Sequence, residues 1–135
     1  MTPGAWRISL AAPLPPISRP TVVNGLSQPG STCASPKVEI RPAAGASFTG
    51  DGLAVLANDC QIRGLVINGF IDSGISLTGA TGCVVSCNFI GTDVTGAALL
   101  GNGTGLVITN GVSNLVGGTD PNTGNLIAGN AGIGV

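Results

Sequence analysis

The sequence predicts an all-β protein built from short strands that stack on one another, and three observations lead to this fold class. A phrase of glycine and aliphatic residues recurs at intervals of 22 to 31 residues. Glycine accounts for 23 of the 135 residues and is spread among short runs of Val, Ile, Leu and Ala, which is typical of tight turns between short strands. No segment carries an apolar stripe at helical spacing, and glycine at this frequency would destabilise a helix.

The recurring phrase reads glycine, aliphatic, small residue, aliphatic, and its copies lie at 52–55, 74–77, 105–108 and 132–135. Alternation with a period of two indicates a strand whose two aliphatic side chains share one face. A four-residue strand cannot bury that face alone, but stacked copies bury it between them. We therefore expect two internal ladders of side chains. They are Leu53, Ile75, Leu106 and Ile133, and Val55, Leu77, Ile108 and Val135.

A second phrase aligns at 62–65, 85–88 and 127–130, with a degenerate copy at 114–117. This alignment places Asn88 and Asn130 at the same position, where a side-chain amide can bond the turn of its own or the next copy. The asparagines are then a device of the fold. Leucine-rich repeats and calcium-binding nonapeptide rolls need consensus residues that are absent, so the pattern favours a parallel β-helix.

Residues 1–50 differ from the rest of the chain. Pro13, Pro15, Pro16 and Pro20 interrupt them, and strand candidates remain at Ile8–Leu10, Thr21–Val23 and Lys37–Ile40. We expect residues 1–50 to form an irregular opening coil that covers the first rung as a cap does in other repeat proteins. Residues 51–135 are expected to form about three coils, truncated at the C-terminus. The uncharged last strand is then expected to fray or to associate end to end.

Several phrases resemble one bacterial family, the right-handed parallel β-helix repeat proteins. They are the segments 17–25, 28–30, 38–40, 63–70, 88–96, 117–119 and 125–130. The resemblance covers most of residues 8–135 and implies a right-handed parallel β-helix, a fold shared with pectate lyases. It also implies a module of a secreted or cell-surface protein, often adhesin-like. No signal peptide is recognised after Met1.

Composition restricts the partners. Only 11 residues are charged, the net charge is −1 and histidine is absent, so no basic field suits nucleic acid. No apolar run approaches the roughly 18 residues of a membrane span, and membrane insertion is not expected. The four cysteines are interpreted as buried, inert thiols, because Cys83 and Cys87 lack the further ligands of a zinc site. Cys60 and Cys83 lie 23 residues apart, and their disulfide state is left open.

The acidic residues offer little catalytic chemistry. Asp51 and Asp72 come nearest to a carboxylate pair, but solvated turn aspartates are favoured. Arg63 is expected on an outer strand face, and the loops at 93–96 and 120–124 are interpreted as Asx-turns rather than calcium sites. The three phenylalanines, Phe48, Phe70 and Phe89, are expected to pack in or against the core.

We therefore predict no catalytic residue, cofactor or metal in this chain. The predicted function is a structural β-solenoid segment whose ligand, if it has one, is a surface polysaccharide or a protein. The alternative is part of a polysaccharide lyase or glycoside hydrolase whose catalytic coil lies outside this chain, because the same fold hosts both activities.

Overall fold

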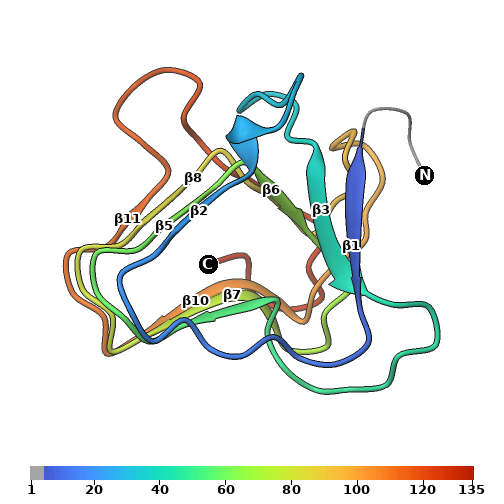
Figure 1. Ribbon diagram of the computed structural model, residues 1–135, viewed down its shortest axis with the longest axis horizontal. Coiled ribbons are helices and arrows are strands. Elements are labelled where there is room, and N and C mark those ends of the chain that lie inside the picture. The colour runs from blue at the N-terminus through green and yellow to red at the C-terminus, as the bar shows by residue number, and fades with distance from the viewer. Residues whose placement is uncertain (1–4) are drawn as a thin grey trace.

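The computed structural model describes residues 5–135 and consists of short strands arranged in three sheets (Figure 1). Residues 1–4, the start of the expected opening coil, lie outside the described residues. Within the described part every pair of strands is parallel, and the one helix is a single 3-10 turn, η1 (Gly25–Ser27). The prediction of an all-β chain is confirmed.

The sheets are named here by order of first appearance. The first sheet contains β1 (Trp6–Leu10), β3 (Val38–Pro42), β6 (Leu65–Ile67), β9 (Phe89–Ile90) and β12 (Leu126–Ile127). The second contains β4 (Leu53–Val55), β7 (Ser73–Thr78) and β10 (Thr104–Thr109), extended by a bridge from Ile17 to Val55. The third contains β2 (Val22–Asn24), β5 (Gln61–Arg63), β8 (Val84–Ser86) and β11 (Leu115–Val116).

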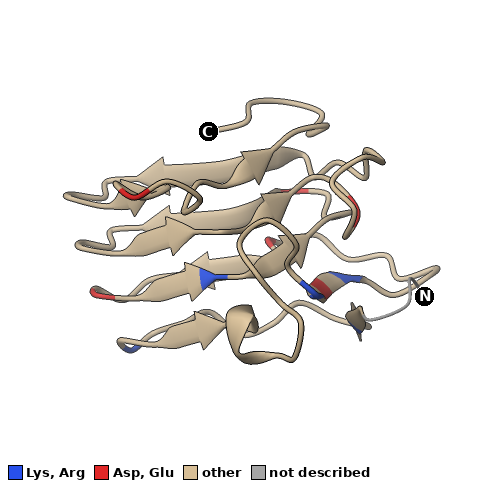
Figure 2. Cartoon of the chain, turned by 90° about the horizontal axis from the view of Figure 1, so that it is seen from above, with Lys and Arg blue, Asp and Glu red and all other residues tan. Residues whose placement is uncertain are grey.

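The chain visits these three sheets in strict rotation. From β3 onward, each strand lies in the sheet after that of the strand before it, and pairs with the strand three places later. Figure 2 shows the result from the side, with successive turns of the chain lying as layers from the N-terminal to the C-terminal end. The apolar core lies inside the three sheets, where each turn covers the one below it.

The inner ladders of the second sheet match the expected register in the first three copies. Leu53 lies opposite Ile75, and Ile75 lies opposite Leu106. Ile75 and Leu106 are fully buried, as expected for side chains with a neighbour on either side. The second ladder aligns Val55, Leu77 and Ile108 in the same way.

The expected register of the fourth copy is wrong by two residues. In the earlier turns, the N–H group of a residue donates to the residue that precedes its opposite partner. Gly52, which lies opposite Gly74, thus donates to Ser73 O at 2.9 Å. In the last turn Gly105 N–H donates to Ile133 O at 3.0 Å, so by the same relation Gly134 lies opposite Gly105, and Val135 lies opposite Leu106. The sequence phrase did not show this offset because Gly132 and Gly134 fit its pattern equally well.

The second phrase is correct in part. Ile62 lies opposite Val85, as expected. The degenerate copy joins the same sheet, but Val116 rather than Asn114 lies opposite Val85, so its expected register is wrong by two residues. Ile127, however, lies opposite Ile90 in the first sheet, so its alignment with Ile62 is wrong. An aliphatic residue followed three positions later by a small or amide residue occurs in both the first and the third sheet. This pattern therefore does not predict which of these two sheets a copy joins.

The three strand candidates of the opening segment are confirmed as β1, β2 and β3. Their partners are regular, since β1 pairs with β3 over five residues and β2 pairs with β5 over three. Between β2 and β3 a loop of residues 25–37 leaves the sheets. The division of the chain at residue 50 stays a prediction.

Candidate functional site

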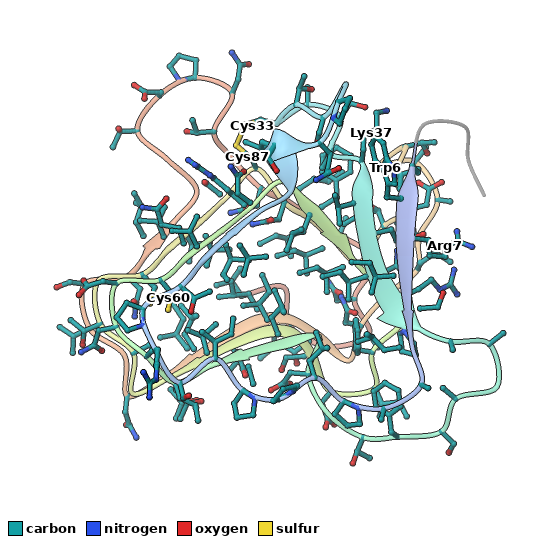
Figure 3. The ribbon with its side chains drawn as sticks, in the orientation of Figure 1. Trp6, Arg7, Cys33, Lys37, Cys60 and Cys87 are labelled. Carbon is teal, nitrogen blue, oxygen red and sulfur yellow. A yellow bond between two sulfur atoms is a disulfide. The ribbon has the colours of Figure 1, made fainter. Side chains whose placement is uncertain are left out.

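A disulfide joins Cys33, in the loop between β2 and β3, to Cys87, in the turn between β8 and β9 (Figure 3). The interpretation of all four cysteines as free thiols is therefore wrong for this pair. Arg63 lies opposite Ser86, so Gly64 occupies the place below Cys87. A Cβ on Gly64 would lie 2.6 Å from the Leu26 backbone nitrogen. The loop thus passes close to Gly64, which has no side chain to obstruct it, and reaches Cys87 in the next turn of the stack.

Cys60 and Cys83 are free and buried. They stack in neighbouring turns, because the residues that follow them, Gln61 and Val84, lie opposite each other. Both thiols contact one carbonyl, that of Ala57, at 3.6 Å from Cys60 Sγ and 3.3 Å from Cys83 Sγ. Burial raises the pKa of the Cys83 thiol above its ordinary value. Both thiols are packing residues of the core, as predicted for them.

Stacked asparagines bond the turns together, as expected, but the expected partners are wrong. Asn88 pairs with Asn125 rather than Asn130, through Asn88 Nδ2 and Asn125 Oδ1 at 3.1 Å. Asn102 pairs with Asn130 in the same way, also at 3.1 Å. Each lower amide also bonds the backbone of the turn beneath it. Asn88 accepts from Leu65 N–H at 3.0 Å and donates to a carbonyl at 2.9 Å.

Sequence reasoning missed an ion pair with a buried carboxylate on the outer side of the first sheet. Glu39 is 1% exposed and accepts from Arg7 Nε at 2.5 Å and from Asn68 Nδ2 at 2.9 Å. Asn68 Nδ2 also donates to Thr92 O at 2.9 Å, which fixes the loop after β9 over the sheet. The signal was present in the sequence, since the strand candidate at 37–40 places Glu39 between two aliphatic residues. The Arg7 side chain is 36% exposed, but the Glu39 carboxylate is buried and both of its oxygens accept hydrogen bonds, so this carboxylate serves to hold the sheet together.

Asp51 and Asp72 have different surroundings in the structure. Asp51 accepts from Ser73 N–H at 2.9 Å and from Ser76 Oγ at 2.6 Å, so both of its carboxylate oxygens hold the neighbouring turn. The Asp72 side chain is exposed. Arg63 lies in β5 on the side opposite the buried Ile62, and its Nε is buried without a hydrogen-bond partner in the described residues.

The two acidic loops behave differently from each other. Asp93 Oδ1 accepts from Thr95 Oγ1 at 2.7 Å and from the N–H groups of Thr95 and Ala98. The Thr95 hydroxyl is the main cause that lowers the Asp93 pKa, with the backbone N–H groups helping, and the predicted Asx-turn is confirmed there. At Asp120 it is the main-chain carbonyl that accepts from Thr123. Among residues 5–135, no group of three or more His, Cys, Asp or Glu side chains gathers as a metal site would require.

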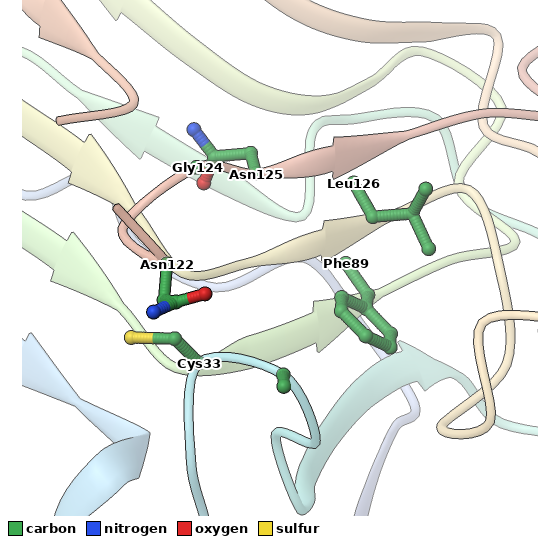
Figure 4. Close-up of a pocket in the computed structure, with 7 residues that line it drawn as sticks. Cys33, Phe89, Asn122, Gly124, Asn125 and Leu126 are labelled. Carbon is green, nitrogen blue, oxygen red and sulfur yellow. The ribbon is translucent and has the colours of Figure 1, made fainter. Parts of the chain in front are cut away.

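A depression of about 380 Å³ lies beside the disulfide (Figure 4). Seven residues from three separate segments line it: Cys33, Ala34, Phe89, Asn122, Gly124, Asn125 and Leu126. Phe89 and Leu126 are stacked neighbours of β9 and β12, and the lining has no charged residue. The Asn125 amide is engaged with Val85 O and with Asn88, whereas the exposed Asn122 makes no side-chain hydrogen bond to the described residues.

This depression was not predicted from the sequence, because the segments that line it are brought together by the disulfide loop. Phe89, expected to pack against the core, is indeed 9% exposed and belongs to a small apolar cluster on the outer side of the first sheet. The depression is therefore a shallow apolar surface with one free amide at its edge.

Comparisons with protein-family models, with curated proteins and with solved structures find no match to this chain. In the part of the chain that the structure describes, no helix has the length and apolar character needed to cross a membrane.

Proposed function

We propose that this chain is a segment of right-handed parallel β-helix that serves as a structural scaffold in a secreted or cell-surface protein. The observation that carries the proposal is the strict rotation of the chain through three parallel sheets, with each strand paired one turn later. A chain that winds in this way buries one continuous core and needs only neighbouring turns for its stability. The right hand is the one implied by the family resemblance of the sequence.

The disulfide supports the proposed location. Disulfides form and persist outside the cytosol, in secreted proteins and on cell surfaces, and are rare where thiols are kept reduced. The Cys33–Cys87 bond joins two positions 54 residues apart, so it constrains a large part of the chain. The thiols of Cys60 and Cys83 are buried and are protected from the same oxidising conditions by packing.

The scaffold assignment is tested first by the winding itself. We expect a circular dichroism spectrum dominated by β-structure, and nuclear Overhauser contacts between backbone protons of opposite residues such as Ile40 and Ile67, and Ile67 and Ile90. A spectrum dominated by helix, or the absence of those contacts in a folded sample, would contradict the β-helix.

The second test concerns catalysis. Both carboxylate oxygens of Asp51 accept hydrogen bonds from the neighbouring turn, so we expect no cleavage of pectate, alginate or glucan, with or without calcium. Release of reducing or unsaturated ends that disappears in Asp51→Asn or Asp72→Asn would favour the carbohydrate-active alternative.

The ligand class that we propose is a neutral sugar unit of a surface polysaccharide, held in the depression beside the disulfide. An aromatic and an aliphatic side chain offer an apolar floor, the free Asn122 amide both donates and accepts, and no charge is present to favour an ionic ligand. Titration with neutral oligosaccharides should shift the amide resonances of Leu126 and Gly124.

Asn122→Ala should weaken those shifts, whereas Asn110→Ala is the matched control. Asn110 is also exposed and also has a positive φ, 53° against 70° for Asn122, but it is not among the lining residues. Equal loss in both variants, or no shift at all, would contradict a sugar site here.

A further inference from the structure

Three polar side chains form a column on the outer side of the third sheet. Asn24 of β2 lies opposite Arg63 of β5, and Arg63 lies opposite Ser86 of β8. Ile62 and Val85, which precede Arg63 and Ser86, are fully buried, so the alternation of a strand directs both polar side chains away from the core. Figure 1 shows β2, β5 and β8 side by side. The column thus has one side chain per turn, about 4.8 Å apart, with Arg63 in the middle.

Arg63 carries a charge that the described residues do not balance. Its Nε is buried and has no hydrogen-bond partner among residues 5–135. The ion pair found in this part of the chain joins Arg7 to Glu39. Asp120, in the loop that follows β11, forms no ion pair with Arg63 there. Because a buried donor without an acceptor costs free energy, an acceptor that reaches the Arg63 guanidinium would be bound favourably.

The two flanking side chains are hydrogen-bond donors as well. Asn24 Oδ1 accepts from Leu26 N–H at 3.1 Å, so its amide oxygen is occupied and its Nδ2 group remains to donate. The Ser86 hydroxyl makes no hydrogen bond within the described part of the chain. The column therefore presents donors on three successive turns, and the central one is charged.

One side of the column is bounded by the disulfide loop, and the next turn of the stack leaves it open. Gly64, the residue after the arginine, lies against this loop, residues 25–37, because a Cβ on Gly64 would be 2.6 Å from Leu26 N. Gly117 continues the column above Ser86. A Cβ on Gly117 would meet no atom within 4 Å, so a small ligand can approach the donors from that side.

We infer that this column binds a tetrahedral oxyanion, the sulfate or phosphate group of a small ligand, with Arg63 as the charged anchor. A guanidinium binds two oxygens of an anion with two parallel hydrogen bonds, and a carboxylate then has no further oxygen for Asn24 and Ser86. A sulfate or phosphate group has oxygens for both. The site is separate from the sugar site proposed above, because none of its three residues lines that depression, and each site is tested without the other.

Titration of the isotope-labelled protein with sodium sulfate at constant ionic strength tests this site. The Arg63 Nε–H resonance and the backbone amide resonances of Asn24 and Ser86 should shift and saturate together, because one anion contacts all three side chains. Inorganic phosphate should act in the same way, and acetate should bind about tenfold more weakly because it leaves two donors without an acceptor. Sulfate binding should weaken as sodium chloride is added.

Four variants identify the donors. Arg63→Gln removes the charge and should abolish the saturable shifts, and Arg63→Lys keeps the charge but loses the planar fork, so it should weaken sulfate binding about tenfold. Ser86→Ala removes one neutral donor and should weaken it about fivefold. Arg41→Gln is the matched control. Arg41 is also half-buried in a strand, but the Glu39 carboxylate two positions away disfavours an anion there, so this variant should bind sulfate like the wild type.

Three results would overturn the inference: a wild-type protein without saturable shifts in sulfate, an Arg63→Gln variant that keeps them, or acetate that binds as tightly as sulfate. Unfolding temperatures are measured on the same samples. If Arg63→Gln does not fold, Ser86→Ala decides, because it removes a single hydroxyl from the outer side of the sheet. Unchanged sulfate affinity in Ser86→Ala would then count against the site.

Discussion

Ile8 and Ile40 are the same residue type, lie directly opposite each other and belong to neighbouring strands of one sheet. Ile40 is nevertheless 5% exposed and Ile8 46% exposed. Among residues 5–135, Ile40 has a strand on either side, in β1 and β6, whereas Ile8 has a neighbouring strand on one side only, in β3. Leu77 and Ile108 show the same contrast at the other end of the stack.

In this molecule, burial is thus set by the position of a residue in the stack as much as by its apolar character. A sequence pattern that assigns a residue to an inner ladder does not say how well that residue is covered. The free energy that each aliphatic side chain contributes should therefore fall from the middle turns towards both ends.

The largest expected effect is that of a charge in the middle of the stack. Ile75→Asp places an unpaired carboxylate between Leu53 and Leu106 and should cost more than about 4 kcal/mol, enough to abolish cooperative unfolding. Ile8→Asp makes the same change on the end rung and should leave the β-type circular dichroism spectrum intact. Equal losses in both variants would show that both positions are covered alike.

Removal of the disulfide is expected to have the next largest effect. In the chain-entropy description, a bond that closes a loop of 54 residues contributes about 4 kcal/mol to the free energy of unfolding. The double variant with Cys33→Ser and Cys87→Ser should lose that amount in urea unfolding. A reducing agent should bring the wild type down to the level of the variant and leave the variant unchanged. A large effect of reduction on the variant would contradict this assignment.

Truncation of the paired isoleucines gives a smaller and more direct measure of the same contrast. Ile40→Ala creates a cavity between two turns and should lower the free energy of unfolding by about 3 kcal/mol. Ile8→Ala removes a side chain that is already half exposed and should cost about 1 kcal/mol. Urea unfolding of the two variants at one protein concentration tests this order, and the reverse order would contradict the layered arrangement.

The smallest expected effect is the pH dependence that arises from Asp93. Its pKa is lowered in the folded state, mainly by the Thr95 hydroxyl. The folded protein therefore stabilises the ionised Asp93 carboxylate more than the unfolded chain does. The resulting stability is present above the ordinary pKa of about 3.8 and is lost as the pH falls through the lower folded value. The unfolding temperature of Asp93→Asn should depend less on pH in this acidic range than that of the wild type.

The sequence was sufficient for the all-β fold, for most strand positions and for the register of the middle copies. Leu53, Ile75 and Leu106 could be aligned because each follows a glycine and precedes a small residue and a second aliphatic. That pattern follows directly from the two-residue period of a strand with one buried face.

The errors arose where a short pattern fits more than one place. Asn130 fits the position of Asn88, but the structure stacks it on Asn102, because the first and third sheets use similar turns. The Cys33–Cys87 bond depends on how far a 13-residue loop, 25–37, reaches past Gly64. Such reach is a property of the three-dimensional path, and the spacing of the cysteines does not reveal it.

The same disulfide determines how the molecule would respond to tension. A pull applied through the two ends of the chain passes across the covalent Cys33–Cys87 bond, so the residues between them bear none of the force while the bond is intact. At roughly 3.5 Å per extended residue, the 54-residue separation corresponds to about 190 Å of chain that cannot be drawn out. Reduction of one bond would release that length, so the greatest extension of the molecule is set by the redox state of its surroundings.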